Sequence, residues 1–299
     1  MKINGVEIDD TFAEAFPMRA TRLIITAMTY KWAYRAANSL TGFASSVIGC
    51  GCEAAIEEEI KIGHTPDGRP GISVLIFAMS TKQLADQVLK RVGQSVMTTA
   101  TAACFSGLHV PDRVPLGKSL RFFGDGYQIS KIVGDVRLWR VPVMHGEFIC
   151  EESTGVTKAV GGGNFLIFAK SSRHGLAACD RAIKAMKKVR GAVAPFPGGV
   201  VGSGSKVGSK YKFLSASTNH LYCPTLKGKV PDSALSDKVG SVLEIVIDGL
   251  DEAAVREAMR VGIHATCSFG PARGIYGISA GNYGGKLGPY HFHLRKVVK

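Results

Sequence analysis

Glu244 is the residue of this 299-residue sequence whose surroundings best suit a proton-transferring group. It stands inside the apolar run 242–247, and alternation along a strand places it on one face with Val242 and Val246. If both faces of that strand are covered, burial raises the pKa of the carboxyl group toward neutrality, as a general acid or base requires. A carboxylate on a solvated face, or one paired with a lysine, is the alternative that the sequence leaves open.

Three polar segments, 194–210, 215–220 and 278–288, carry many hydrogen-bond donors. Glycines allow backbone N–H groups to approach a ligand closely, and serine and lysine side chains add further donors for an anion or a carbonyl oxygen. Neither the phosphate-binding loop nor the dinucleotide-binding spacing of glycines occurs. A flexible surface loop or a wide hairpin turn is the competing interpretation. The candidate substrate-binding residues in these segments are Gly198, Gly199, Ser203, Ser205, Lys206, Ser209, Lys210, Ser217, Thr218, Asn219, Asn282, Gly284, Gly285 and Lys286.

The sequence gives little support for a metal site or a covalent nucleophile. Cys50 and Cys52 lack a second ligand pair at useful spacing, and His291 and His293 share a strand face without further ligands nearby. The G-x-S-x-G pattern of serine hydrolases is absent. We therefore expect no structural metal and no acyl-serine chemistry.

The net charge of +13, from 37 basic and 24 acidic residues, predicts an anionic partner. The basic residues are dispersed, and the strand-borne stacking aromatics of an RNA-binding domain are missing. A multiply anionic small molecule fits such a surface as well as nucleic acid does, and we expect no nucleic acid to be bound.

The remaining composition favours a cytoplasmic protein. No stretch of about 18 apolar residues occurs, so we expect no membrane segment, and the N-terminus carries acids where a signal peptide is apolar. The seven cysteines are odd in number and irregularly spaced, which is typical of reduced thiols.

Four segments repeat one pattern of strand, amphipathic helix and second strand. Pairs of such units predict an α+β fold of two ferredoxin-like (split βαβ) lobes related by internal duplication, residues 1–145 and 146–299. Hairpins are expected at Gly124–Gly126 and at Gly134-Asp135. The expected strands, helices and second strands are 23–26, 29–40 and 43–50; 72–77, 81–92 and 97–104; 164–168, 174–188 and 192–196; and 242–247, 251–263 and 274–280.

Several long motifs, spread over essentially the whole chain, resemble one family. They are the opening residues 3–16, the segment 65–71, Phe122 to Gln128, Gly162-Gly163-Asn164-Phe165, Ala194 to Lys210, Ser217-Thr218-Asn219 and Ile278 to Gly288. Together these resemble formylmethanofuran–tetrahydromethanopterin formyltransferase.

The resemblance implies a reversible transfer of the formyl group from formylmethanofuran to N5 of tetrahydromethanopterin, in one-carbon metabolism such as methanogenesis. It implies that Glu244 is the acid/base residue, that Gly162, Gly163 and Asn164 bind substrate, and that no metal or prosthetic group is held permanently. It also implies a homo-oligomer, commonly a tetramer built as a dimer of dimers, with anionic C1 carriers as ligands. Acidic partner subunits would equally suit the positive charge. The alternative is a non-catalytic, cofactor-binding subunit of a larger C1-transfer complex.

Overall fold

The computed structural model describes residues 1–299 and divides the chain into two compact units. Unit 1 consists of Met1–Pro17 and Val160–Lys299, and unit 2 consists of Met18–Ala159. Two long strands, β3 (Phe12–Thr26) and β12 (Thr157–Ala169), contribute residues to both units. The fold is mixed α+β, with seven α-helices, which confirms the expected class. None of these helices combines the length and the apolar character that crossing a membrane requires.

Unit 2 begins as two strand–helix–strand segments that form one antiparallel sheet in the order β6-β3-β5-β4. The hydroxyl groups of Thr29 and Ser80 cap its two long helices by accepting hydrogen bonds from the N–H groups of Trp32 and Gln83. The apolar faces of these helices join the sheet in a separate core around Leu40, Val74 and Val88. The elements after β3 are α1 (Tyr30–Thr41), β4 (Glu53–Ile60), β5 (Gly71–Ala78), α3 (Thr81–Arg91) and β6 (Ala103–Ser106).

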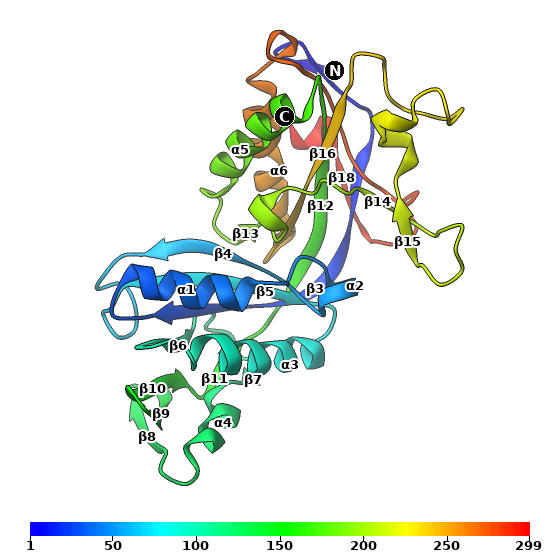
Figure 1. Cartoon of the computed structure of the whole chain (residues 1–299). Helices are drawn as coiled ribbons and strands as arrows, with labels where there is room; N and C mark the ends of the chain where they lie inside the picture. Colours follow the sequence, from blue (N-terminus) through cyan, green and yellow to red (C-terminus); the bar gives the residue numbers. More distant parts are fainter. The chain divides into compact units, whose positions relative to one another are not determined.

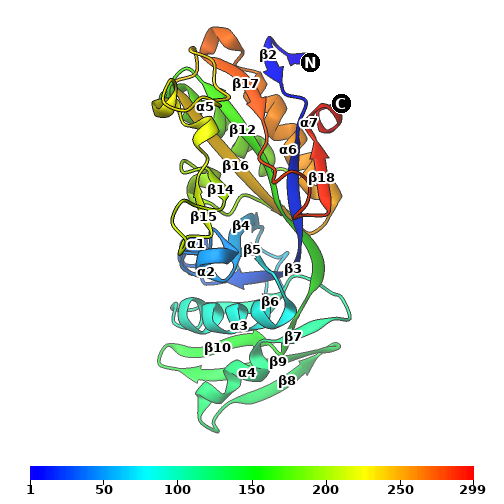
Figure 2. The same cartoon turned by 90° about the vertical axis from the view of Figure 1, so that its right-hand side faces the viewer.

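Unit 2 ends in an antiparallel meander that extends its sheet beyond β6 (Figure 2). The predicted turn Gly134-Asp135 joins two of its strands directly, which confirms that hairpin. The elements are β7 (Arg113–Pro115), α4 (Gly117–Leu120), β8 (Ile129–Val133), β9 (Val136–Val143), β10 (Gly146–Glu151) and β11 (Ser153–Gly155).

Unit 1 has the same arrangement, with antiparallel strands in the order β17-β12-β16-β13. Its helices α5 and α6 pack side by side on one face of this sheet (Figure 1). Leu243 packs against Gly175 of α5, and Phe165 packs against Gly262 of α6. The core of this unit therefore lies between that face and the helices. The elements after β12 are α5 (Ser172–Met186), β13 (Ala192–Val193), β16 (Ser241–Gly249), α6 (Glu252–Cys267) and β17 (Ile275–Ser279).

Both chain ends and one long insert complete unit 1. Strand β2 pairs in parallel with β17, and β18 pairs antiparallel with the first residues of β3. The insert 194–240 leaves the sheet between β13 and β16 and contains the hairpin β14–β15. The bounds are β1 (Lys2–Ile3), β2 (Val6–Ile8), β14 (Ser205–Val207), β15 (Ala216–Thr218), β18 (Tyr290–His293) and α7 (Leu294–Val297).

Three local predictions in unit 2 are wrong. Residues 43–50 do not form a strand, because Ser46 caps the short helix α2 (Val47–Cys50) and the strand begins only at Glu53. Residues 97–102 also lie outside any strand, because α3 continues into a π-helical turn, Val92–Val96. At Gly124–Gly126 the chain ends a 3-10 helix, with Asp125 in the left-handed conformation, instead of turning between paired strands.

Candidate active site

Glu244 lies on the sheet face of unit 1 that is turned away from the helices. Its strand β16 pairs with β12 so that Glu244 is opposite Leu166. The neighbouring Leu243 packs against α5, and successive side chains of a strand point to opposite faces. The alternation predicted from the sequence is therefore confirmed, with one face given to the core and the other to Glu244.

The insert 194–240 covers the face of the sheet that carries Glu244. Val201 of the insert pairs with Glu244 itself, through hydrogen bonds in both directions of 2.7 and 3.0 Å. Further along the same face, the ring of Tyr222 packs against Phe168 of β12 at 5.7 Å between centroids. Figure 1 shows the insert and the helices on opposite sides of β12 and β16. The glycine-rich segment 194–210 is thus brought directly to the predicted acid/base residue.

The carboxyl group of Glu244 is half-buried and has no partner. Neither of its oxygens takes part in a hydrogen bond or an ion pair. Burial raises the pKa of Glu244 to about 7, because the charged form loses hydration without gaining compensation. Of the two possibilities that the sequence left open, the structure favours the desolvated carboxyl.

Three unused backbone donors follow the pairing at Val201. The N–H groups of Gly202, Ser203 and Gly204 have no acceptor within the chain. They belong to the segment that the sequence singled out for its donors, and they begin one residue beyond the point where this segment is fixed to Glu244. Such free N–H groups could hold an oxyanion or a carbonyl oxygen.

Asn164 connects the motif 162–164 to the loop at 281–288. Its amide nitrogen donates hydrogen bonds to the carbonyl oxygens of Gly162 and Gly281, at 3.1 Å each. Its Oδ1 accepts the N–H of Gly281 at 2.6 Å. Gly163 faces α6, where the Cβ of any larger residue would collide with Val255. In this structure the motif therefore builds the sheet and holds the loop next to the face of Glu244.

The loop 281–288 is folded around a carboxylate that the sequence did not single out, Glu14 of β3. Glu14 is 1% exposed and accepts four backbone N–H groups, those of Tyr283 at 2.7 Å, Gly285 at 2.8 Å, Leu287 at 2.6 Å and Gly288 at 2.7 Å. Burial alone would raise its pKa, but the four donors outweigh burial and hold the pKa of Glu14 at about 2. An acid inside the apolar run 12–16 was the only sequence signal for it.

Two further predicted residues of this loop differ in their surroundings. The side chain of Asn282 donates to Thr11 Oγ1 at 3.1 Å and to the carbonyl of Phe12 at 3.2 Å, and it accepts the N–H of Gly284 at 3.1 Å. Asn282 thus helps to build the loop. Lys286 is exposed and makes no hydrogen bond, so its ammonium group is free to meet an anion.

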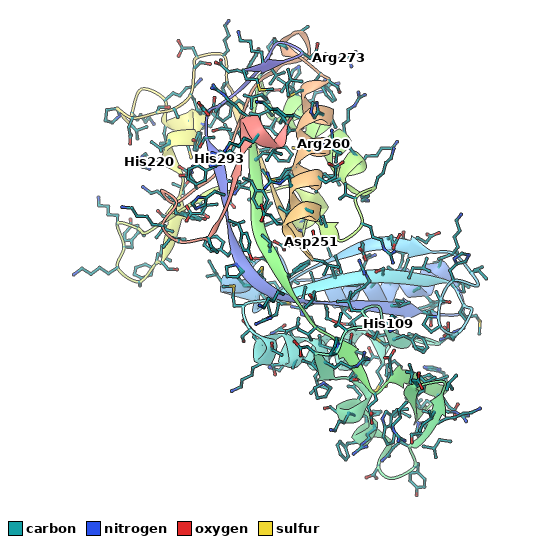
Figure 3. All side chains as sticks on the ribbon, turned by 180° about the vertical axis from the view of Figure 1, so that it is seen from behind. His109, His220, Asp251, Arg260, Arg273 and His293 are labelled. Atoms are coloured by element: carbon teal, nitrogen blue, oxygen red, sulfur yellow. The ribbon has the colours of Figure 1, made fainter.

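Within the insert, the predicted residue Lys206 contacts a histidine that is itself paired with an aspartate. Its Nζ lies 2.8 Å from Nδ1 of His220 (labelled in Figure 3), and Nε2 of that histidine lies 3.2 Å from Asp232. The other predicted serine, threonine and lysine residues of the insert divide into two groups. Ser209, Ser217 and Thr218 make hydrogen bonds inside the insert, whereas Ser203, Ser205 and Lys210 are exposed and their side chains make none.

The structure shows no metal-binding group, and its cavity lies apart from the predicted site residues. No group of three or more His, Cys, Asp or Glu side chains is arranged to hold a metal ion. A cavity of about 660 Å³ in unit 1 is lined by α6, α7 and the C-terminus, including Glu252, Arg260 and Lys299, and by none of the predicted site residues.

Comparison with known proteins places these features in one family. A family model described as formylmethanofuran-tetrahydromethanopterin formyltransferase matches residues 1–143, and a model described as its proximal lobe matches residues 146–297. The enzyme of that name from Methylococcus capsulatus is 61% identical, with both chains covered completely. Among solved structures, a chain of the formyltransferase/hydrolase complex of Methylorubrum extorquens, in complex with methylofuran, is 48% identical with a TM-score of 0.98 and covers 100% of this chain and 99% of its own. The formyltransferase of Methanosarcina barkeri is 45% identical, with a TM-score of 0.94 and coverages of 99% and 100%.

Proposed function

The chain belongs to the formylmethanofuran–tetrahydromethanopterin formyltransferase family, and from that membership we propose that Glu244 is the acid/base residue of its reaction. The protein is an acyltransferase of one-carbon metabolism, as its relatives are, and it transfers the formyl group between formylmethanofuran and tetrahydromethanopterin. Both carriers are substrates in this reaction. The comparison thus favours the enzyme over the non-catalytic subunit that the sequence left as an alternative.

The transfer exchanges one C–N bond for another. N5 of tetrahydromethanopterin attacks the formyl carbon, and the carbonyl oxygen becomes an oxyanion in the tetrahedral intermediate. The bond to the methanofuran nitrogen then breaks, and this nitrogen must gain a proton to leave as an amine, while N5 loses one. Glu244 gives its proton to the leaving nitrogen and regains one from N5, so that the carboxyl group is unchanged after each turnover.

The observation that carries this role is the isolation of the Glu244 carboxyl. It has neither a hydrogen-bond donor nor a cation to hold it ionised, and burial raises its pKa to about 7. A group with this pKa is present in both protonation states at neutral pH, so it can give and take a proton without a large energetic cost.

The oxyanion needs hydrogen-bond donors, and we propose that the free N–H groups of Gly202, Ser203 and Gly204 supply them. They are unpaired and follow the residue that is bonded to Glu244. Losing one such donor typically costs about 3–4 kcal/mol of transition-state stabilisation. The remaining predicted residues, Lys210 and Lys286 in particular, are proposed to attract the anionic tails of the carriers.

The test is the substitution Glu244→Gln, which keeps the shape of the side chain and removes its proton exchange. We expect turnover with saturating carriers to fall about 100- to 10,000-fold, with an unchanged circular dichroism spectrum. Glu7→Gln, the same change on the exposed face of β2, is the matched control and should stay within about twofold of wild type. Near-normal turnover of Glu244→Gln would show that another group transfers the proton.

The architecture and assembly expected from the sequence remain proposals with specific support. Each unit has strand order 4-1-3-2 with two helices on one face, as two ferredoxin-like lobes related by duplication require. A boundary near residue 145 agrees with the separate ranges of the two family models. A homotetramer, a cytoplasmic location and acidic partner subunits are proposed likewise. A related chain occurs in a formyltransferase/hydrolase complex, and all seven cysteines are free thiols.

A further inference from the structure

We propose that Glu14 is a positioning residue of the formyl transfer: it folds the loop 281–288 around its carboxylate so that the hydroxyl group of Tyr283 is presented to the substrate beside Glu244. This inference rests on the proposed role of Glu244 and adds two residues to it. Glu14 itself contacts no substrate, because it is buried and surrounded by the loop.

Most backbone N–H groups of the loop 281–288 point inward. Four of its N–H groups converge on the two oxygens of Glu14, and a fifth, from Gly284, is taken by Asn282. Donors that point inward cannot bind a ligand. The glycines of this loop therefore let the backbone wrap a carboxylate of the protein itself, and six of the eight N–H groups of residues 281–288 are used within the chain.

Asn164 anchors the loop to the sheet face that carries Glu244. The side chain of Asn164 makes three hydrogen bonds, two of them to Gly281 and one to the carbonyl oxygen of Gly162. Asn164 lies on β12 two residues before Leu166, which is opposite Glu244, so the two side chains share a face. Strand β17 pairs with β12 on the side away from β16. The loop therefore leaves the sheet one strand away from Glu244, with Asn164 between them, and Tyr283 follows two residues after Gly281.

Tyr283 is partly exposed and is held in place by two neighbours. The residue is 38% exposed, and its ring packs against Phe16, 6.0 Å away between centroids, while its backbone N–H donates to Glu14. Burial raises the pKa of the Tyr283 phenol, and the charges of Glu244 and Glu14 raise it further. The hydroxyl therefore remains protonated at neutral pH, close to Glu244, and can donate a hydrogen bond to the carbonyl oxygen of a formyl group bound there.

The experiment is a double-mutant cycle of Glu14→Gln and Tyr283→Phe, read out as kcat/KM for formyl transfer. We expect each single variant to lose roughly 10- to 100-fold, because one removes the hydroxyl and the other releases the loop that carries it. If Glu14 acts through Tyr283, the double variant loses no more than Glu14→Gln alone. Tyr290→Phe, on the neighbouring strand β18, is the matched control and should keep wild-type kcat/KM.

A merely structural role for Glu14 predicts a different pattern. In that case the two losses multiply in the double variant, or Tyr283→Phe is fully active, and either result overturns the proposal. If Glu14→Gln does not fold, Asn282→Ala loosens the same loop while leaving Glu14 in place, and the cycle with Tyr283→Phe is repeated in that background.

The outcome separates this inference from the role of Glu244. Full activity of Glu244→Gln would refute that role and leave the coupling between Glu14 and Tyr283 measurable. Inactive Glu244→Gln together with multiplicative losses in the cycle would refute the positioning role alone.

Discussion

Unit 1 holds two glutamates in apolar strands, and their surroundings drive them to opposite states. Glu14 receives four backbone N–H groups, and its pKa is held at about 2 despite burial. Glu244 receives none, and burial raises its pKa to about 7. Burial alone thus does not decide the charge of a carboxyl group; the number of donors aimed at it does.

This contrast separates a carboxylate that organises the chain from one that is available for chemistry. A pair of titratable groups with diverging pKa values is a pattern expected of acid/base sites. Here the ionised Glu14 shapes a loop, and Glu244, which titrates near neutral pH, lies on the sheet face beneath the insert 194–240. If the four donors account for the difference, substitutions at the two glutamates should change stability in opposite directions.

The largest stability effect is expected at Glu14. The gap between an ordinary glutamate and a pKa of about 2 corresponds to about 3 kcal/mol of stability. Because the folded-state pKa is lowered, this contribution is complete above about pH 4.5 and is lost as the pH falls toward 2. Glu14→Gln should therefore lower the free energy of unfolding in urea by about 3 kcal/mol or more at pH 7, and by progressively less toward pH 3. A loss that does not change with pH would contradict this account.

Glu244→Gln should change the free energy of unfolding in the opposite direction and stabilise the protein. Because the folded-state pKa is raised to about 7, the wild-type protein loses stability as the pH rises from about 4.5 to 7, and the whole cost is present above pH 7. The neutral amide avoids that cost and should stabilise the protein by up to about 3 kcal/mol at pH 8 and by little at pH 4. Chemical unfolding at the two pH values measures the difference. Equal stability of variant and wild type at pH 8 would mean that the carboxyl is better solvated than its position indicates.

The pH dependence of formyl transfer above pH 5 should follow the titration of Glu244 and not that of Glu14. If Glu244 supplies the proton to the leaving amine, kcat falls about tenfold for each pH unit above about 7, or about 1.4 kcal/mol of barrier per unit. Measuring kcat from pH 5 to 9 tests this, with the carriers saturating throughout. A flat profile from pH 7 to 9 would assign the proton to another group.

The smallest effect is expected at a carboxylate with a single donor. Asp251 caps α6 and accepts one N–H, from Ala254, at 2.7 Å in an exposed position (Figure 3). Asp251→Ala should cost about 1 kcal/mol of stability, with unchanged kcat/KM. A loss approaching that of Glu14→Gln would mean that burial and the three additional donors contribute little.

The fold followed from local patterns wherever these patterns were strong. The alternation in 242–247 correctly placed Glu244 on one face of a strand, and apolar periodicity located all four long helices of the repeats. The segment 43–50 was misassigned because its apolar residues suggested a strand, whereas Ser46 starts a helix there.

The site was predictable in its motifs but not in its contacts. Family motifs identified the activity and the loops. The pKa of Glu244 depends on the insert that covers it, and the role of Glu14 depends on N–H groups 269 to 274 residues away. No local pattern indicates which donors will reach a carboxylate over such a separation. For the same reason, the sequence did not indicate that Asn282, which it predicts to bind substrate, makes hydrogen bonds that build the loop.

The separation in sequence between Glu14 and its loop also fixes the order in which the two units can fold during synthesis. Residues 1–17 leave the ribosome first, yet they belong to the unit that is completed last. At 5–20 residues per second, Glu14 waits roughly 14 to 55 seconds for Gly288 to be synthesised. Meanwhile the continuous segment Met18–Ala159 is already available to fold. A nascent chain stalled before residue 281 would therefore carry a complete sequence of unit 2 and an N-terminal segment whose Glu14 lacks its four N–H donors.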